Sequence, residues 1–258
     1  FERSDGHTIW ANMDQWEGQR WAFTPGNLTS TPKKIYIDPN SSEEIDLVLE
    51  NVIPPVEIPE DTKWVKRIKF ESEMLSKFWS HPMYLGATVL LPKDYEDNPN
   101  KEYPVIYLQN HFSLDPPFGF TTEPTQNEGV GFDTLFVENR SNVENPRPYH
   151  GGGVKETGYE FYKSWISDNF PELIVVTFQH PTPYFDDSYG VNSVNNGPYG
   201  DAIMQELIPR VEEKFRITSE PESRALTGGS TGGWMSLALQ VKHPKFFGGA
   251  WVYYPDPV

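Results

Sequence analysis

Short apolar runs separated by polar breaks organise the chain from about residue 62 onward. Residues 103–108 and 173–178 are continuous apolar runs, which is typical of central strands that are buried on both faces. Residues 64–70 and 84–91 predict two strands joined by a loop, and residues 247–254 predict one more. These segments together predict a single sheet.

Two later segments have helical spacing instead. One covers residues 201–215 despite Pro209, and its predicted inward positions are Ile203, Met204, Leu207, Ile208, Val211 and Phe215. The other runs to about Lys242 before Pro244 and is predicted to be mostly buried. Its apolar positions at i, i+3, i+4 and i+7 are Trp234, Leu237, Ala238 and Val241, with Met235 and Leu239 beside them. Buried strands that alternate with helices predict an α/β fold whose sheet is parallel in its later part.

Residues 1–61 have a different character. Residues 34–37 and 45–49 predict two strands with a turn-rich segment between them. Residues 53–59 carry three prolines and predict an extended linker, because proline cannot donate to the ladder inside a sheet. We therefore expect a β-rich N-terminal segment over residues 1–61 and a second domain over residues 62–258.

The charge balance of the chain limits the classes of partner that we expect it to bind. Acidic residues outnumber basic ones 37 to 21, which gives the 258-residue chain a formal net charge of −16. Such a field repels nucleic acid and anionic membrane surfaces, so we expect neither as a partner, and no window is long and apolar enough for insertion into a membrane. Aromatic residues make up 14% of the chain, a composition that suits the binding of sugars or aromatic esters as well as core packing.

The sequence contains no cysteine, which excludes disulfides, thiolate nucleophiles and cysteine-ligated metals. It begins with Phe1 and not with methionine, so we expect a processed or truncated chain. The absence of cysteine suits an oxidising compartment. We expect a secreted or periplasmic protein, with the cytoplasm as the alternative.

Residues 228–232 match the pattern G-x-S-x-G around Ser230. In a nucleophile elbow this pattern places a serine on a sharp turn between a strand and a helix, where only glycine or a residue nearly as small fits two positions away on either side. Residues 224–227 predict the end of a short strand, and the predicted helix follows the serine. Strand, serine and helix therefore occur in the required order.

From about Trp64 to Val258 the sequence resembles the α/β-hydrolase superfamily, and within it the putative-esterase, or esterase D-like, group. Residues 105–112, 195–209 and 227–234 carry the resemblance. It implies a serine esterase that acts on acylated small molecules or acylated carbohydrates through an acyl-enzyme, without a cofactor or a metal.

The resemblance also implies roles for particular residues. Ser230 would be the nucleophile, and the oxyanion would be held by backbone N–H groups of Thr231 and of His111 or Phe112. The family commonly has His-Gly where this chain has Asn110 and His111. A backbone N–H can donate whatever side chain its residue carries, so the oxyanion hole stays a prediction despite this difference.

The catalytic acid and base are harder to assign. In this superfamily they follow the serine in the order acid, then histidine, and His243 is the only histidine after Ser230. Thirteen residues along a helix correspond to about 20 Å, so His243 is too far away to be the base. Asp256 is a candidate acid. We therefore expect the chain to lack its last strands and its own histidine, which would come from beyond residue 258 or from a second chain.

Further residues are weaker candidates. His180 and Tyr199 lie near the ends of predicted elements, Trp234 begins the helix after Ser230, and each could contact a ligand, as could Asp256. Core or loop packing is the alternative for each of them. Two other functions stay open: a non-catalytic binding protein with a hydrolase fold, and an acyltransferase or peptidase on the same fold.

Overall fold

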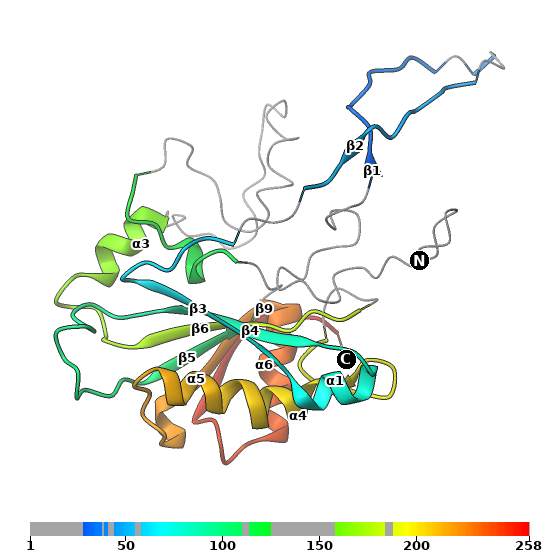
Figure 1. The fold of residues 1–258 in the computed structure, drawn as a ribbon. Helices are drawn as coiled ribbons and strands as arrows, with labels where there is room; N and C mark the ends of the chain where they lie inside the picture. The colour runs from blue at the N-terminus through cyan, green and yellow to red at the C-terminus, as the bar shows by residue number, and fades with distance from the viewer. Residues whose placement is uncertain are drawn as a thin grey trace.

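The structure is a computed structural model, and it describes residues 28–37, 39–40, 44–54, 58–109, 114–124, 158–183 and 188–257. Its centre is a six-stranded sheet (Figure 1). The six strands are β3 (Val65–Glu71), β4 (Tyr84–Leu90), β5 (Val105–Gln109), β6 (Ile174–Gln179), β9 (Arg224–Ser230) and β10 (Gly249–Pro255).

The strand order is β10-β9-β5-β6-β4-β3. β4 is antiparallel to both of its neighbours, whereas β6, β5, β9 and β10 are parallel to one another. The carboxyl ends of these four strands therefore meet at one edge of the sheet, the edge at which open α/β sheets bind ligands. This topology confirms the predicted mixed, mostly parallel α/β sheet.

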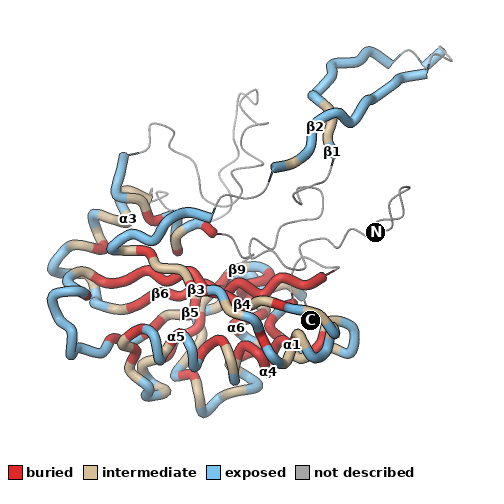
Figure 2. The backbone as a smooth tube through the Cα atoms, viewed as in Figure 1, coloured by how far each residue is buried: buried red, intermediate tan, exposed pale blue. Residues whose placement is uncertain are grey.

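Helices cover both faces of the sheet (Figure 1). On one face α3 packs through Trp165 against a cluster that includes Leu90, Phe120 and Val175. The other face holds the larger core. The buried segments, red in Figure 2, run along the central strands and parts of the helices. The helices are α1 (Glu73–Trp79), α3 (Gly158–Trp165), α4 (Tyr199–Ala202), η3 (Ile203–Leu207), α5 (Ile208–Lys214) and α6 (Thr231–Lys242), with single turns η2 (Pro117–Gly119) and η4 (Pro221–Ser223). None of the described helices has the length and apolar character that a membrane span requires.

Helix α1 replaces the loop predicted between the first two strands of the sheet. Its N-cap is Ser72, whose hydroxyl accepts a hydrogen bond from the backbone N–H of Leu75. The carboxylate of Glu206 accepts from the N–H of Met74, so a residue far along the chain satisfies a second donor of the first turn. A seven-residue helix held in this way has too short an apolar repeat to be recognised from sequence.

The helix predicted over residues 201–215 forms three continuous pieces, α4, η3 and α5. The middle piece, η3, is a π-helix that ends just before Pro209, a residue with no N–H to donate within the helix. Five of the six predicted inward residues are buried, and Met204 is partly buried against the same core. The predicted burial pattern is therefore confirmed.

The strands predicted over residues 34–37 and 45–49 are wrong. Those residues have no strand pairing. The ladder in this region lies outside the two predicted segments and joins the two-residue strands β1 (Leu28–Thr29) and β2 (Asn51–Val52). Their apolar side chains remain exposed, with Tyr36 at 91% and Val48 at 70%. β-Branched and aromatic residues favour an extended backbone, but in the described part of the chain these side chains are left exposed. The predicted division into two domains at residue 61 stays a prediction.

The burial predicted for the helix after Ser230 is wrong at two positions, Leu237 and Val241. Leu237 and Val241 are 40% and 69% exposed, whereas Met235 and Leu239 are buried in the core. The helix is apolar on more than one side, so spacing alone did not identify the side that packs on β9 and β10.

A charged network joins the start of β9 to α5. Arg224 donates two hydrogen bonds of 2.7 Å to the carboxylate of Glu212, and Tyr107 donates a third of 2.8 Å. The side chains of Arg224 and Glu212 are only 7% and 16% exposed. Burial, followed by the neighbouring carboxylate, raises the pKa of Tyr107 well above its usual value. The strand that leads to Ser230 is thus fixed at its beginning by a buried ion pair.

We expect Arg224→Met to lower the free energy of unfolding by about 3 kcal/mol, because it leaves the carboxylate of Glu212 buried without its cation. Urea unfolding followed by circular dichroism measures the change. Lys93→Met is the control, because Lys93 pairs with an aspartate whose side chain is 91% exposed. The urea midpoint of this variant should equal that of the parent protein. Equal losses of stability in the two variants would contradict the stabilising role of the buried pair of Arg224 and Glu212.

Candidate functional site

Ser230 occupies a sharp turn at the carboxyl edge of the sheet. It is the last residue of β9, and α6 begins at the next residue. Its backbone has φ 54° and ψ −125°, a conformation that non-glycine residues rarely adopt. Such a residue costs about 1–3 kcal/mol and persists only where its surroundings hold it, which is common at active sites.

Gly228, the first glycine of the pattern around Ser230, is required by space. A Cβ on Gly228 would lie 2.4 Å from the carbonyl oxygen of Gly232 and 2.6 Å from that of Gln109. Both contacts are to backbone, which cannot move aside cheaply. The strand and the helix therefore approach each other so closely that only a hydrogen atom fits at residue 228, as the G-x-S-x-G pattern requires.

We expect Gly228→Ala to lower the free energy of unfolding by about 2 kcal/mol, because the added methyl group overlaps two carbonyl oxygens. Gly249→Ala is the matched control. Gly249 lies in β10, and no atom lies within 4 Å of a Cβ built there. Chemical denaturation should show little change for the control, and a Gly228→Ala protein as stable as the parent would refute the steric conflict.

The side chain of Asp256 contacts the turn directly. Ser230 Oγ donates to Oδ1 of Asp256 at 2.9 Å, and Thr231 Oγ1 donates to Oδ2 at 2.8 Å. A register shift in β10 contributes to this arrangement: Tyr253 pairs with Gly229 and Pro255 pairs with Ser230, so Tyr254 is an extra residue with φ 30°. β-Bulges of this kind redirect the following side chains and are common beside active sites.

Thr231, the predicted oxyanion donor, directly follows Ser230. It is the first residue of the twelve-residue helix α6, and its side chain is buried. The first N–H groups of a helix have no partner within the helix and lie at the positive end of its dipole, which suits the stabilisation of an anion. The other predicted donors, His111 and Phe112, lie outside the described residues.

Two of the predicted ligand contacts are buried in the protein. Tyr199 is fully buried in the core, its hydroxyl donates to the carbonyl of Pro181, and burial raises its pKa. His180 is also fully buried, and its Nδ1 lies 2.8 Å from Ser188 Oγ. The structure does not bring either ring to the surface beside Ser230, and packing accounts for both positions.

Tyr189 lies beside the turn and was missed in the sequence. Its ring meets that of Trp234 edge to face at a centroid distance of 5.4 Å, and its hydroxyl lies 3.5 Å from Oδ2 of Asp256. Tyr189 has φ 54°, and Ser188 Oγ accepts from the N–H of Gly190. The pair Tyr-Gly after a serine indicates a tight turn, but nothing in the sequence places that turn against α6. Trp234 is half-buried, so this aromatic pair could form one wall of a site.

His243 follows the far end of α6, twelve helical residues away from the turn. Among the residues that the structure describes, the hydrogen-bond partner of Ser230 Oγ is Asp256. Those residues also contain no group of three or more histidine, aspartate or glutamate side chains placed to hold a metal ion.

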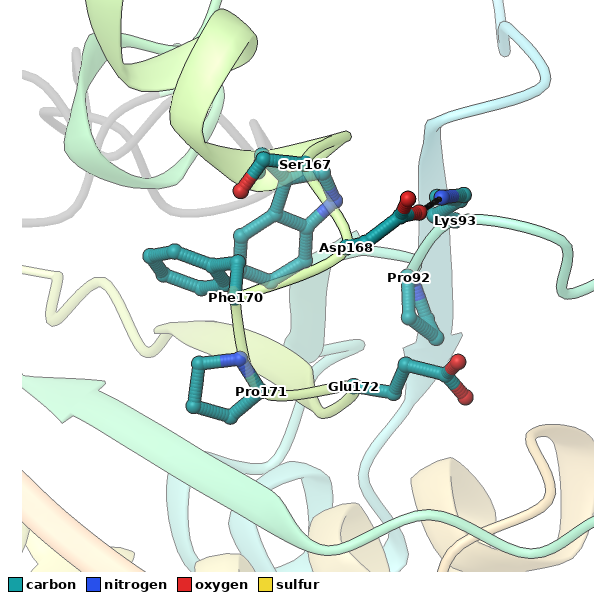
Figure 3. Close-up of a pocket in the computed structure, with 8 residues that line it drawn as sticks. Pro92, Lys93, Ser167, Asp168, Phe170, Pro171 and Glu172 are labelled. Atoms are coloured by element: carbon teal, nitrogen blue, oxygen red, sulfur yellow. Dashed lines mark hydrogen bonds and ion pairs between the residues drawn. The ribbon is translucent and has the colours of Figure 1, made fainter.

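A small pocket lies elsewhere, on the opposite edge of the sheet (Figure 3). It is lined by Pro92, Lys93, Trp165, Ser167, Asp168, Phe170, Pro171 and Glu172. Glu172 lies just before the amino end of β6, and β6 runs parallel to β9, so this pocket is remote from the carboxyl edge that holds Ser230. Lys93 and Asp168 pair across it, and the pocket offers no nucleophile beside a base.

Comparison with known proteins gives a family match over the later part of the chain. Residues 152–255 match the family described as "Putative esterase". The uncharacterised protein YbbA of Bacillus subtilis (strain 168) is 40% identical over 165 residues, which cover 62% of this chain and 52% of that protein. The chain thus spans about half the length of this relative.

Two solved structures are more distant. A ferulic acid esterase is 20% identical with a TM-score of 0.46, and the match covers 74% of this chain and 59% of that one. An S-formylglutathione hydrolase from Agrobacterium tumefaciens is 14% identical with a TM-score of 0.44, over 77% of this chain and 61% of that one. The match to the putative-esterase family spans β6, the Ser230 turn, α6 and β10, so the later part of the chain, which carries this turn, is the part that is similar to that family.

Proposed function

We propose that this protein hydrolyses carboxylic esters, with Ser230 as the nucleophile and an acyl-enzyme as the intermediate. The observation that carries the proposal is the strained turn of Ser230 between β9 and α6, at the edge of the sheet where the carboxyl ends of four parallel strands meet. The match of residues 152–255 to an esterase family supports the same reaction class.

The geometry suits attack on a carbonyl carbon. Ser230 Oγ forms the new bond to the acyl carbon and gives its proton to a base, and the carbonyl oxygen becomes an oxyanion. The N–H of Thr231, directly after the nucleophile, would donate to that oxyanion. Collapse of the intermediate releases the alcohol with the proton from the base, and a water molecule then removes the acyl group by the same steps in reverse.

The proposal assigns the base to a histidine outside the described residues, because the Ser230 hydroxyl donates to Asp256 and His243 follows the far end of α6. That histidine would come from another part of the polypeptide or from a second chain.

The half-exposed aromatic pair of Tyr189 and Trp234 favours substrates with a flat hydrophobic or sugar face, so we propose acylated small molecules or carbohydrates as substrates. A secreted or periplasmic location would suit such substrates. Acyl transfer or peptide hydrolysis would share the acyl-enzyme step, and the acceptor would distinguish them.

We expect the protein to react with a fluorophosphonate probe and to hydrolyse p-nitrophenyl acetate, and we expect Ser230→Ala to abolish probe labelling and lower hydrolysis at least ~100-fold. Ser167→Ala is the control, because Ser167 lines the pocket on the opposite edge. Labelling that survives in Ser230→Ala, or an unlabelled parent protein, would exclude the proposed nucleophile and favour a non-catalytic binding protein.

A further inference from the structure

Asp256 holds the first two residues of the turn through one carboxylate. Oδ1 accepts from Ser230 Oγ at 2.9 Å, and Oδ2 accepts from Thr231 Oγ1 at 2.8 Å. The backbone N–H of Asp256 also donates to the carbonyl of Ser230 at 3.2 Å. We propose that Asp256 is a positioning residue for the nucleophile, which fixes the rotamer of Ser230 and the backbone of Thr231. This inference rests on the proposed ester hydrolysis.

The contact between Asp256 and Ser230 depends on backbone segments in strained conformations. Six non-glycine residues in the described part of the chain have positive φ, and three of them, Tyr189, Ser230 and Tyr254, surround Asp256. The bulge at Tyr254 lets Pro255 pair with Ser230, which brings the next residue to the serine hydroxyl. The hydroxyl of Tyr189 lies 3.5 Å from Oδ2 of Asp256. An arrangement that needs three unfavourable conformations indicates a functional constraint, because an ordinary strand end would form without them.

Orientation is the contribution that the carboxylate can make. Its negative charge has the wrong sign to stabilise an oxyanion beside Thr231, and a carboxylate is a far weaker base than the alkoxide that loss of the serine proton would create. By contrast, a hydroxyl that donates to a fixed acceptor before the reaction has its oxygen held in one rotamer, and its single proton moves from its hydrogen bond with Asp256 to the base when the attack begins. The side chain of Thr231 is held in the same way, which fixes the adjacent N–H that would face the oxyanion. Small displacements of such groups lower reaction rates severely.

The test compares reaction rates of folded variants. Asp256→Ala removes both acceptors, and Asp256→Asn keeps one carbonyl oxygen at nearly the same size. We expect Asp256→Ala to lower both kcat on p-nitrophenyl acetate and the second-order rate of fluorophosphonate labelling at least tenfold, with KM changed less than twofold. The asparagine variant should retain more activity than the alanine variant. Asp168→Ala is the control, because Asp168 is 91% exposed on the opposite edge, and its rates should equal those of the parent.

A second pair of variants tests the other oxygen of the carboxylate. Thr231→Ser retains a hydroxyl that can donate to Asp256, whereas Thr231→Val has nearly the shape of threonine without the donor. We expect the serine variant to be labelled at least threefold faster than the valine variant. Rates are measured well below each melting temperature, so that a loss of stability alone does not appear as a loss of rate.

The outcomes separate the two proposals. An inactive, unlabelled parent protein refutes ester hydrolysis and the inference with it. If the parent is active but folded Asp256→Ala and Asp256→Asn react within twofold of it, the positioning role is refuted and the proposed function stands. Faster reaction in either variant would also overturn the inference, because the carboxylate would then restrain the serine. An effect confined to KM would indicate contact with substrate and would overturn it as well.

Discussion

The close approach of two backbone segments at Gly228 controls the geometry of the candidate site. A strand that ended with a larger residue at this position could not let α6 begin so near, because its Cβ would overlap the carbonyl oxygens of Gly232 and Gln109. Ser230 has positive φ in the same turn, directly before the first residue of α6. The ion pair of Arg224 with Glu212 fixes the other end of the same strand, so β9 is held firmly at both ends.

The part of the fold that could be predicted is the part with a continuous apolar signal. β5 and β6 lie in the middle of the sheet, and short continuous runs of apolar residues are typical of such central parallel strands. Helix α1 was missed because it has only seven residues, and the contact of its first turn with the distant Glu206 leaves no local pattern. The exposed face of α6 was misassigned because Leu237 and Val241 are as hydrophobic as Met235 and Leu239. Composition does not show which side of an apolar helix a sheet will cover.

The candidate site also has a part that could be predicted from the sequence and a part that could not. Ser230 and Thr231 could be placed because the strained turn requires glycine at fixed offsets, which is a local constraint visible in five residues. The contact of Asp256 with Ser230 depends on the register shift at Tyr254, and no sequence pattern places a bulge at that residue. Tyr189 reaches the site through a loop anchored to His180 by Ser188. His180 was expected near a ligand, and in the structure its contact is with the loop that carries Tyr189.

The concentration of positive φ angles at Tyr189, Ser230 and Tyr254 has a consequence for engineering. Glycine relieves this kind of backbone strain at an entropic cost of about 0.5–1 kcal/mol, which is smaller than the strain of about 1–3 kcal/mol, so selection for thermal resistance alone should favour glycine at these positions. Each such replacement would remove an aromatic ring or a hydroxyl from the surroundings of Asp256. A protocol that improves heat tolerance should therefore hold these three residues constant, and improvements should be sought in the exposed segment around Tyr36 and Val48, where apolar side chains face solvent.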